Sequence, residues 1–191
     1  LVFDKKKRVI AQVAPAVRVA LGEEFGLEPG TVTIGKMVAA LKRLGVEEVY
    51  DTAFGADMTV ITEGQEFIER LNEGKNLPLF TSCCPGWVKF AENTFPEILD
   101  NISSCKSPQQ MFGSVIKEYY KEKDSLDGRE TAVISIMPCT AKKAEAARKE
   151  FQRDGIRDVD LVITTQELAM IIKESGIMFS KLEDESFDMP F

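Results

Sequence analysis

Short apolar runs alternate with amphipathic stretches along this chain of 191 residues. Residues 9–14 form such a run, and Val17, Leu21 and Phe25 then repeat at helical spacing. Such runs are typical of strands that are buried on both faces, and helical connections leave these strands parallel. The alternation therefore predicts an α/β protein with mainly parallel strands flanked by helices.

Capping residues set the expected boundaries. Ser107 and Gln110 have the spacing of a capping box, with Pro108 as the first helical residue, and Thr164 and Glu167 form another. The strands are expected at residues 9–14, 47–51, 77–81, 131–137 and 160–164. The helices are expected at residues 15–25, 34–44, 58–71, 107–121 and 164–176.

The second half of the chain repeats the scheme of the first half. We therefore expect two lobes, the first over residues 1–110 and the second, incomplete, over residues 111–191. Ligands of open α/β sheets bind beyond the carboxyl ends of the strands. The functional site is accordingly expected in the cleft between the lobes.

The composition argues against two classes of partner. A net charge of −7 disfavours nucleic acid, because phosphate binding needs a basic surface. The basic run at residues 5–8 is expected to be a solvated lead-in to the first strand. No run of about 18 apolar residues exists, so no membrane span is expected. The charged start at Leu1 does not resemble a signal peptide and indicates an internal piece of a longer, cytoplasmic protein.

The chain has four cysteines and no histidine. In the cytoplasm these thiols would stay reduced. Without histidine, proton transfer has to use Cys, Glu, Asp, Lys, Ser or water.

Cys84 and Cys139 share one local setting. Each follows an expected strand and precedes an expected helix, where free N–H groups favour a thiolate. Two thiolates presented in this way suit a soft metal, and iron–sulfur clusters are held by such ligands. Inert buried thiols would fit the same pattern, so the pattern alone leaves both interpretations open.

Glu63, Glu66 and Arg70 are spaced i, i+3 and i+7, which places them on one face of the expected third helix. An ordinary solvated ion-pair face has the same spacing. A proton route is the other interpretation that this spacing allows.

Three motifs resemble those of the catalytic domain of iron-only hydrogenases. TSCCPGW at residues 81–87 and MPCTAKKAE at residues 137–145 are similar to the first two signature motifs of that family. SCKSPQQM at residues 104–111 is similar to the stretch between them, and VAPAVRVALGE at residues 13–23 also fits. The likeness runs from about residue 8 to residue 190.

The resemblance implies an enzyme that catalyses the reversible oxidation of H2 and reduction of protons. The cofactor of the family is a 4Fe–4S cluster joined to a di-iron unit with CO, CN and dithiolate ligands. Cys84 and Cys139 match two of the metal ligands, and the family's later CxxxC motif, which supplies the other two, is absent before Phe191. We therefore expect the cofactor to be absent or incomplete in this chain, and the chain alone to be inactive.

The resemblance also implies a proton route. It assigns the successive positions to Cys83 as the free thiol beside the cluster, then Glu66, Ser103 and the outer Glu63, with Arg70 at the exit. Such a route works if burial raises the pKa values of the glutamates toward neutrality.

Further positions match the pocket of the di-iron unit. They are Lys142, Gln109, Pro108, Met137, Ala14 and Pro15. Lys142 corresponds to a lysine that donates to one cyanide, and Ala14 and Pro15 would offer backbone groups near the other. Met137 would be a polarizable wall, although core packing explains it equally well. Cys105 matches no ligand and is expected to be packed.

Electrons would pass to or from ferredoxin or flavin- and NAD-linked subunits, and H2 and protons would be the substrates. Three alternatives exist, namely a non-catalytic iron–sulfur assembly relative, a hydrogen sensor, and an α/β binding domain with structural cysteines or zinc. Glu63, Glu66, Ser103 and Met137 together favour catalysis over assembly, and Cys83 disfavours a sensor. Zinc would require four closely spaced Cys or His ligands.

Overall fold

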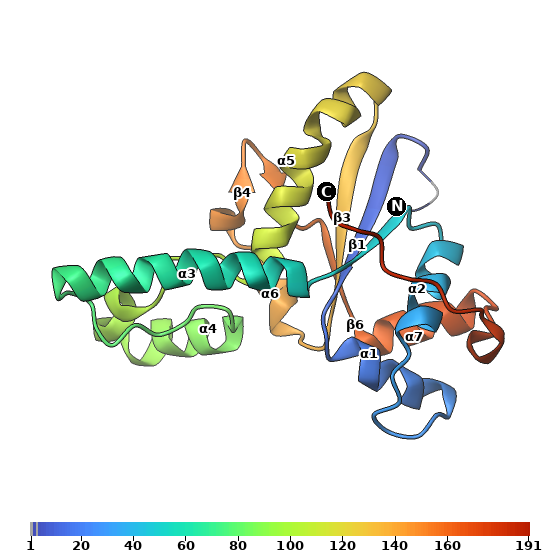
Figure 1. Ribbon diagram of the computed structural model, residues 1–191, viewed down its shortest axis with the longest axis horizontal. Helices are drawn as coiled ribbons and strands as arrows, with labels where there is room; N and C mark the ends of the chain where they lie inside the picture. Colours follow the sequence, from blue (N-terminus) through green and yellow to red (C-terminus); the bar gives the residue numbers. More distant parts are fainter. Residues whose placement is uncertain (1, 3) are drawn as a thin grey trace.

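The computed structural model describes residue 2 and residues 4–191. Its main sheet contains four parallel strands in the order β2-β1-β3-β6 (Figure 1). Their bounds are Glu48–Asp51 for β2, Lys7–Val13 for β1, Glu130–Met137 for β3 and Leu161–Thr164 for β6. A short hairpin, β4 (Gln152–Arg153) and β5 (Ile156–Arg157), stands apart from this sheet. The predicted α/β fold with parallel strands and flanking helices is confirmed.

Helices cover both faces of the sheet. They are α1 (Val17–Ala20), α2 (Ile34–Arg43), α3 (Ala53–Glu73), α4 (Pro85–Thr94), α5 (Pro108–Asp127), α6 (Ala141–Ala146) and α7 (Thr165–Glu174). Short 3-10 turns lie at Leu21–Phe25, Pro96–Asn101, Lys149–Phe151 and Phe179–Lys181. Figure 1 shows α5 on one side of the sheet, α2 and α7 on the other, and α3 projecting away from the sheet above α4.

The two central strands explain why the expected runs were continuous rather than alternating. Ile10 and Val13 of β1 and Val133 and Ile136 of β3 are all fully buried, because helices cover both of their sides. None of the helices that the structure describes combines the length and apolar character needed to cross a bilayer.

Two helix boundaries follow from side-chain caps. Thr164 and Glu167 form the complete predicted capping box at the start of α7, whereas Ser107 accepts the N–H of Gln110 at 3.4 Å at the start of α5. The third helix begins at Ala53 rather than near residue 58, because the Asp51 carboxylate accepts the Ala53 N–H at 2.9 Å.

The strand predicted at residues 77–81 is wrong. Only Phe80 pairs, in an isolated parallel bridge to Ile102. The Phe80 N–H donates to the carbonyl of Asn101 at 2.8 Å, and its own carbonyl accepts from Ser103 N–H at 2.7 Å. The segment lies beside α3 and α4, away from the main sheet, so no neighbouring strand extends the pairing.

The basic run at residues 5–8 does not remain solvated throughout. Arg8 is buried within β1, where its guanidinium pairs with Asp124 at 3.0 Å and Asp127 at 2.5 Å. This residue therefore ties the first strand to the end of α5.

The main sheet draws strands from both predicted lobes. β1 and β2 belong to residues 1–110 and β3 and β6 to residues 111–191, yet β1 pairs directly with β3. The boundary at residue 110 therefore does not separate one sheet from another among the described residues. The acidic tail also returns to the first half, where the Asp188 carboxylate accepts the Val49 N–H at 2.8 Å.

Candidate functional site

The carboxyl edge of the sheet brings two predicted site segments together. Val13 at the end of β1 pairs with Ile136 near the end of β3, so residues 14–16 and 138–139 follow at the same edge. The Ala14 N–H donates to the Ile136 carbonyl at 3.0 Å and joins the two segments.

Cys84 and Cys139 each introduce a helix. Cys84 is the N-cap residue of α4, and Cys139 lies between the end of β3 and the start of α6. Cys84 is exposed and Cys139 is half-buried, so both thiols are accessible. The predicted setting before a helix is present for both, although only Cys139 follows a strand.

Both cysteine motifs border one groove of about 610 Å³. Pro85 and Gly86 of α4 line one side, and Ala141 and Ala144 of α6 line the other. The Lys142 ammonium also donates to the Cys83 carbonyl at 2.7 Å, which connects the second motif directly to the first.

Cys84 and Cys139 offer the kind of ligand that iron–sulfur clusters use, but they are two where a cubane needs four. Thiolates are the ligands of iron–sulfur clusters, and a cubane needs four. Across residue 2 and residues 4–191, no three Cys, His, Asp or Glu side chains gather in a metal-binding arrangement. Cys84 and Cys139 are thus thiols of the required kind, and they make up half of the number that a cubane needs.

Lys142 and Gln109 lie together beside this groove. Both contact Glu145, at 3.1 Å from the Lys142 ammonium and 2.9 Å from the Gln109 amide nitrogen. Pro108 occupies the first position of α5 and is half-buried. Glu145 was not predicted as a site residue, although its opposite charge three residues after Lys142 on one helix was a readable signal.

Three other predicted pocket residues have structural roles. The Ala14 N–H is used by Ile136, and the carbonyls of Ala14 and Pro15 accept the N–H groups of Val17 and Arg18 at 3.1 and 3.3 Å. Met137 belongs to the buried hydrophobic core at the end of β3. These contacts give each residue a reason to be present that does not involve a ligand.

Glu66, Ser103 and Arg70 form one hydrogen-bonded group. The Ser103 hydroxyl donates to Glu66 at 2.8 Å and the Arg70 guanidinium donates to Glu66 at 2.7 Å. Arg70 also donates to the carbonyls of Asp100 and Ile102 at 3.0 and 2.9 Å. The structure thus joins three of the five residues predicted for the proton route.

The electrostatics of Glu66 differ from the expectation. Burial pushes the pKa of its carboxyl up, but the Ser104 N–H, the Ser103 hydroxyl and the Arg70 guanidinium together outweigh burial, so the pKa lies below its usual value. The condition named for the route, a rise of the pKa toward neutrality, is therefore not met at Glu66.

The contacts of Arg70 bear on the order of the route. The residue predicted for the exit pairs with Glu66, whereas Glu63 was predicted as the outer carboxylate. Within the part of the chain that the structure describes, no hydrogen bond joins Cys83 to Glu63 or Glu66.

Burial raises the pKa of the Cys105 thiol, and the nearby Glu66 and Glu63 raise it further against the effect of Ser103.

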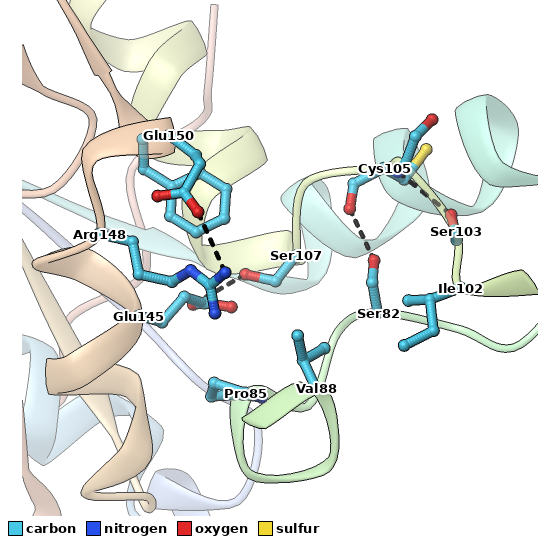
Figure 2. Close-up of a pocket in the computed structure, with 12 residues that line it drawn as sticks. Ser82, Pro85, Val88, Ile102, Ser103, Cys105, Ser107, Glu145, Arg148 and Glu150 are labelled. Atoms are coloured by element: carbon cyan, nitrogen blue, oxygen red, sulfur yellow. Dashed lines mark hydrogen bonds and ion pairs between the residues drawn. The ribbon is translucent and has the colours of Figure 1, made fainter. Parts of the chain in front are cut away.

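A cavity of about 230 Å³ lies between Ser103, which bonds to Glu66, and Glu145, which pairs with Lys142. Figure 2 shows Ser103, Cys105 and Ser82 on one side of it and Ser107 and Glu145 on the other. The Ser82 hydroxyl donates to the Cys105 carbonyl at 2.7 Å, so the TSCC loop forms part of the wall.

Fold and site together define a parallel α/β domain with two accessible thiols before helices and an adjoining carboxylate group. Residues 7–191 match the family described as iron only hydrogenase large subunit, C-terminal domain. The chain belongs to this family.

Relatives and solved structures agree with this family. The chain is 53% identical over 190 residues to the NADP-reducing hydrogenase subunit HndD of Solidesulfovibrio fructosivorans, covering 96% of this chain and 32% of that protein. It is 37% identical to cytosolic iron-sulfur assembly component 3 of Bos taurus, covering 97% of this chain and 40% of that protein. The solved [FeFe]-hydrogenase structure HydA(deltaEFG) matches with a TM-score of 0.89 and 46% identity, over 98% of this chain and 47% of that one. The chain thus spans between a third and a half of the length of these proteins.

Proposed function

We propose that this chain is the part of an iron-only hydrogenase catalytic domain that supplies two cluster thiolates, Cys84 and Cys139, and the inner wall of the active-site pocket. The parent enzyme would catalyse reversible H2 oxidation and proton reduction. The observation that carries the proposal is the Lys142 hydrogen bond to the Cys83 carbonyl, because it brings both signature motifs to one groove.

When bound, the 4Fe–4S cluster with its di-iron unit, including CO, CN and dithiolate ligands, would supply the metal chemistry and carry electrons to and from the redox partner. Cys84 and Cys139 would hold iron. Lys142 would present an N–H donor from a nearly dry wall, since its side chain is mostly buried. Gln109 would support this wall, because its amide nitrogen donates to Glu145 and to the Lys142 carbonyl. Pro108, Met137, Ala14 and Pro15 would shape the pocket rather than donate to it.

The proton route is proposed in a revised order. Cys83 would exchange protons with Glu63, and Ser103 would pass them to Glu66, beside Arg70 at the surface end. The Arg70 contact of Glu66 supports this order, because Arg70 was predicted for the exit. The Ser103 contact of Glu66 is compatible with either order. Glu66, with its lowered pKa, would accept and release a proton without storing it.

The chain alone would be inactive, because two of four cubane ligands are not among its cysteines. Ferredoxin or a flavin- and NAD-linked subunit would exchange electrons with the parent enzyme. The similarity to a subunit named as NADP-reducing supports a nicotinamide link. The cytoplasm is the proposed compartment, since it keeps thiols such as the four free cysteines reduced.

A non-catalytic assembly role is the second candidate, supported by the 37% identity to the bovine assembly component. The linked Glu66, Ser103 and Arg70 favour the hydrogenase, because hydrogen-bonded carboxyl and hydroxyl groups can serve proton transfer.

Iron analysis of the anaerobically purified chain tests the proposal. The chain is reconstituted with ferrous iron, sulfide and a small thiol that can provide the missing ligands, and iron and labile sulfide per chain are measured. Cys84→Ser and Cys139→Ser should each lose most of the iron, while the matched control Cys105→Ser should keep it. Equal iron in all three variants, or zinc in place of iron, would contradict the proposal. Hydrogen evolution by the chain alone would contradict the predicted inactivity.

A further inference from the structure

Glu145 is a buried carboxylate on the short helix α6. Only 4% of its side chain is exposed, and it belongs to the second cysteine motif without being a metal ligand. A buried carboxylate is costly unless donors surround it, so its contacts indicate what it does.

Three donors converge on Glu145. The Ser107 hydroxyl donates to its Oε2 atom at 3.0 Å (Figure 2). The Gln109 amide nitrogen donates to the same atom at 2.9 Å. The Lys142 ammonium lies 3.2 and 3.1 Å from Oε1 and Oε2. The carboxylate thus joins the N-cap and the first turn of α5 to α6.

The ammonium of Lys142 extends this chain of contacts to the first motif. It donates to the Cys83 carbonyl at 2.7 Å while it pairs with Glu145. Lys142 therefore has two anchors, and one of them is a charge that the low dielectric of a buried site makes strong. The next residue, Lys143, offers a comparison because it pairs with the exposed Glu167 at the surface.

We propose that Glu145 is the positioning residue of this region, which fixes the Lys142 ammonium beside the Cys83 carbonyl and holds the Gln109 amide at the start of α5. What the Lys142 ammonium faces rests on the proposed function, whereas its fixation by Glu145 does not. The carboxylate holds a donor of each motif segment through a separate hydrogen bond, so the Lys142 ammonium is held in place before any ligand arrives.

Two substitutions separate the charge of Glu145 from its shape. Glu145→Gln keeps an oxygen that can accept from Ser107 and Gln109 but removes the charge that holds the ammonium. Glu145→Asp keeps the charge on a side chain shorter by one methylene. Glu150→Gln is the control, because Glu150 is 62% exposed and pairs with Arg148 at 3.0 Å in the same neighbourhood.

Competitive amine labelling of the folded 191-residue chain, read by mass spectrometry, measures the fixation of Lys142 directly. In the unchanged chain Lys142 should react more slowly than Lys143. In Glu145→Gln its rate should rise about threefold toward that of Lys143, the ratio of their exposed fractions of 13% and 41%. Lys143 itself should not change, and Glu150→Gln should leave both rates as they were. Circular dichroism checks the fold, and Glu145→Asp, with an intermediate rate expected, replaces the Gln variant if that variant fails to fold.

An unchanged Lys142 rate in a folded Glu145→Gln variant would overturn the proposal. A rise shared by every lysine would do the same, because it would mean that Glu145 merely stabilises the fold. Labelling needs no bound iron, so its outcome is independent of the iron analysis of the cysteine variants. A change in labelling without any iron binding would leave Glu145 a positioning residue and refute the metal site instead.

Discussion

The packing of α3 against α5 depends on Gly55, and replacing this residue gives a sharp test of the fold. A β-carbon at Gly55 would lie 2.6 Å from the Pro108 carbonyl oxygen and 2.7 Å from the Phe112 β-carbon. Neither atom is the free end of a flexible side chain, so α3 would have to move away from α5. Because α3 carries Glu63, Glu66 and Arg70, the same movement would displace the carboxylate group.

The expected cost of Gly55→Ala is that of an overpacked core, about 1–3 kcal/mol. Gly64 on the same helix provides a matched control, since a β-carbon there meets nothing within 4 Å. Gly64→Ala should instead stabilise the chain by about 0.5–1 kcal/mol, because alanine has the higher helix propensity. The same substitution should therefore act with opposite sign at two positions of one helix.

Urea denaturation followed by circular dichroism measures both effects. With a slope of about 2 kcal/mol per molar urea, a loss of about 2 kcal/mol lowers the midpoint by about 1 M. Gly64→Ala should raise the midpoint at an unchanged slope. If Gly55→Ala stabilised the chain as much as Gly64→Ala, the close contact between α3 and α5 would not exist and this reasoning would be refuted.

Three further predictions concern charge, capping and exposure. Since the pKa of Glu66 lies below its ordinary value of 4.5, Glu66 stabilises the fold above about pH 4.5, and this contribution is lost as the pH falls through the folded-state pKa. Glu66→Gln should remove that component from a plot of stability against pH. An unaltered plot would argue against the Ser103 and Arg70 contacts. Thr164→Ala should cost about 1 kcal/mol in urea denaturation through loss of the α7 capping box, and a change near zero would count against the cap. Ile61→Lys should change stability by no more than about 0.5 kcal/mol, because Ile61 is 73% exposed on α3; a larger loss would mean that this face is covered.

The sequence was sufficient for most elements of the fold because local signals mark their ends. The capping pair Thr164 and Glu167 places the start of α7, and Ser107 with Pro108 places the start of α5. The continuous apolar runs predict parallel strands because β1 and β3 lie at the centre of the sheet. These signals act over a few residues, and the structure follows them.

The sequence does not reveal pairings between segments that lie far apart along the chain. Residues 77–81 have the composition of a strand, but a strand also needs a partner along its length, and only Phe80 finds one. The order of strands is equally a matter of distant pairing. A division at residue 110 follows the sequence, whereas β1 pairs with β3 although 116 residues separate the end of β1 at Val13 from the start of β3 at Glu130.

The site divides in the same way. The i, i+4 relation of Glu66 and Arg70 is visible in the sequence, and their ion pair was within reach of prediction. Ser103 lies 37 residues from Glu66, so only the motif resemblance suggested that they belong together. Glu145 was passed over because it resembles an ordinary helical partner of Lys142, and nothing in the sequence reveals that Ser107 and Gln109 bond to it.

The lowered pKa of Glu66 follows from its hydrogen bonds to Ser103 and Arg70, two residues of the proposed proton route. Ser103 must donate to Glu66 if a proton is to pass between them, and this hydrogen bond stabilises the ionised carboxylate. Arg70 must hold the loop at Asp100 and Ile102 against α3, and its guanidinium lowers the same pKa. The contacts that join Ser103 and Arg70 to Glu66 therefore make Glu66 a carboxylate that favours the ionised form. In the proposed route, Glu66 would pass a proton on rather than hold one.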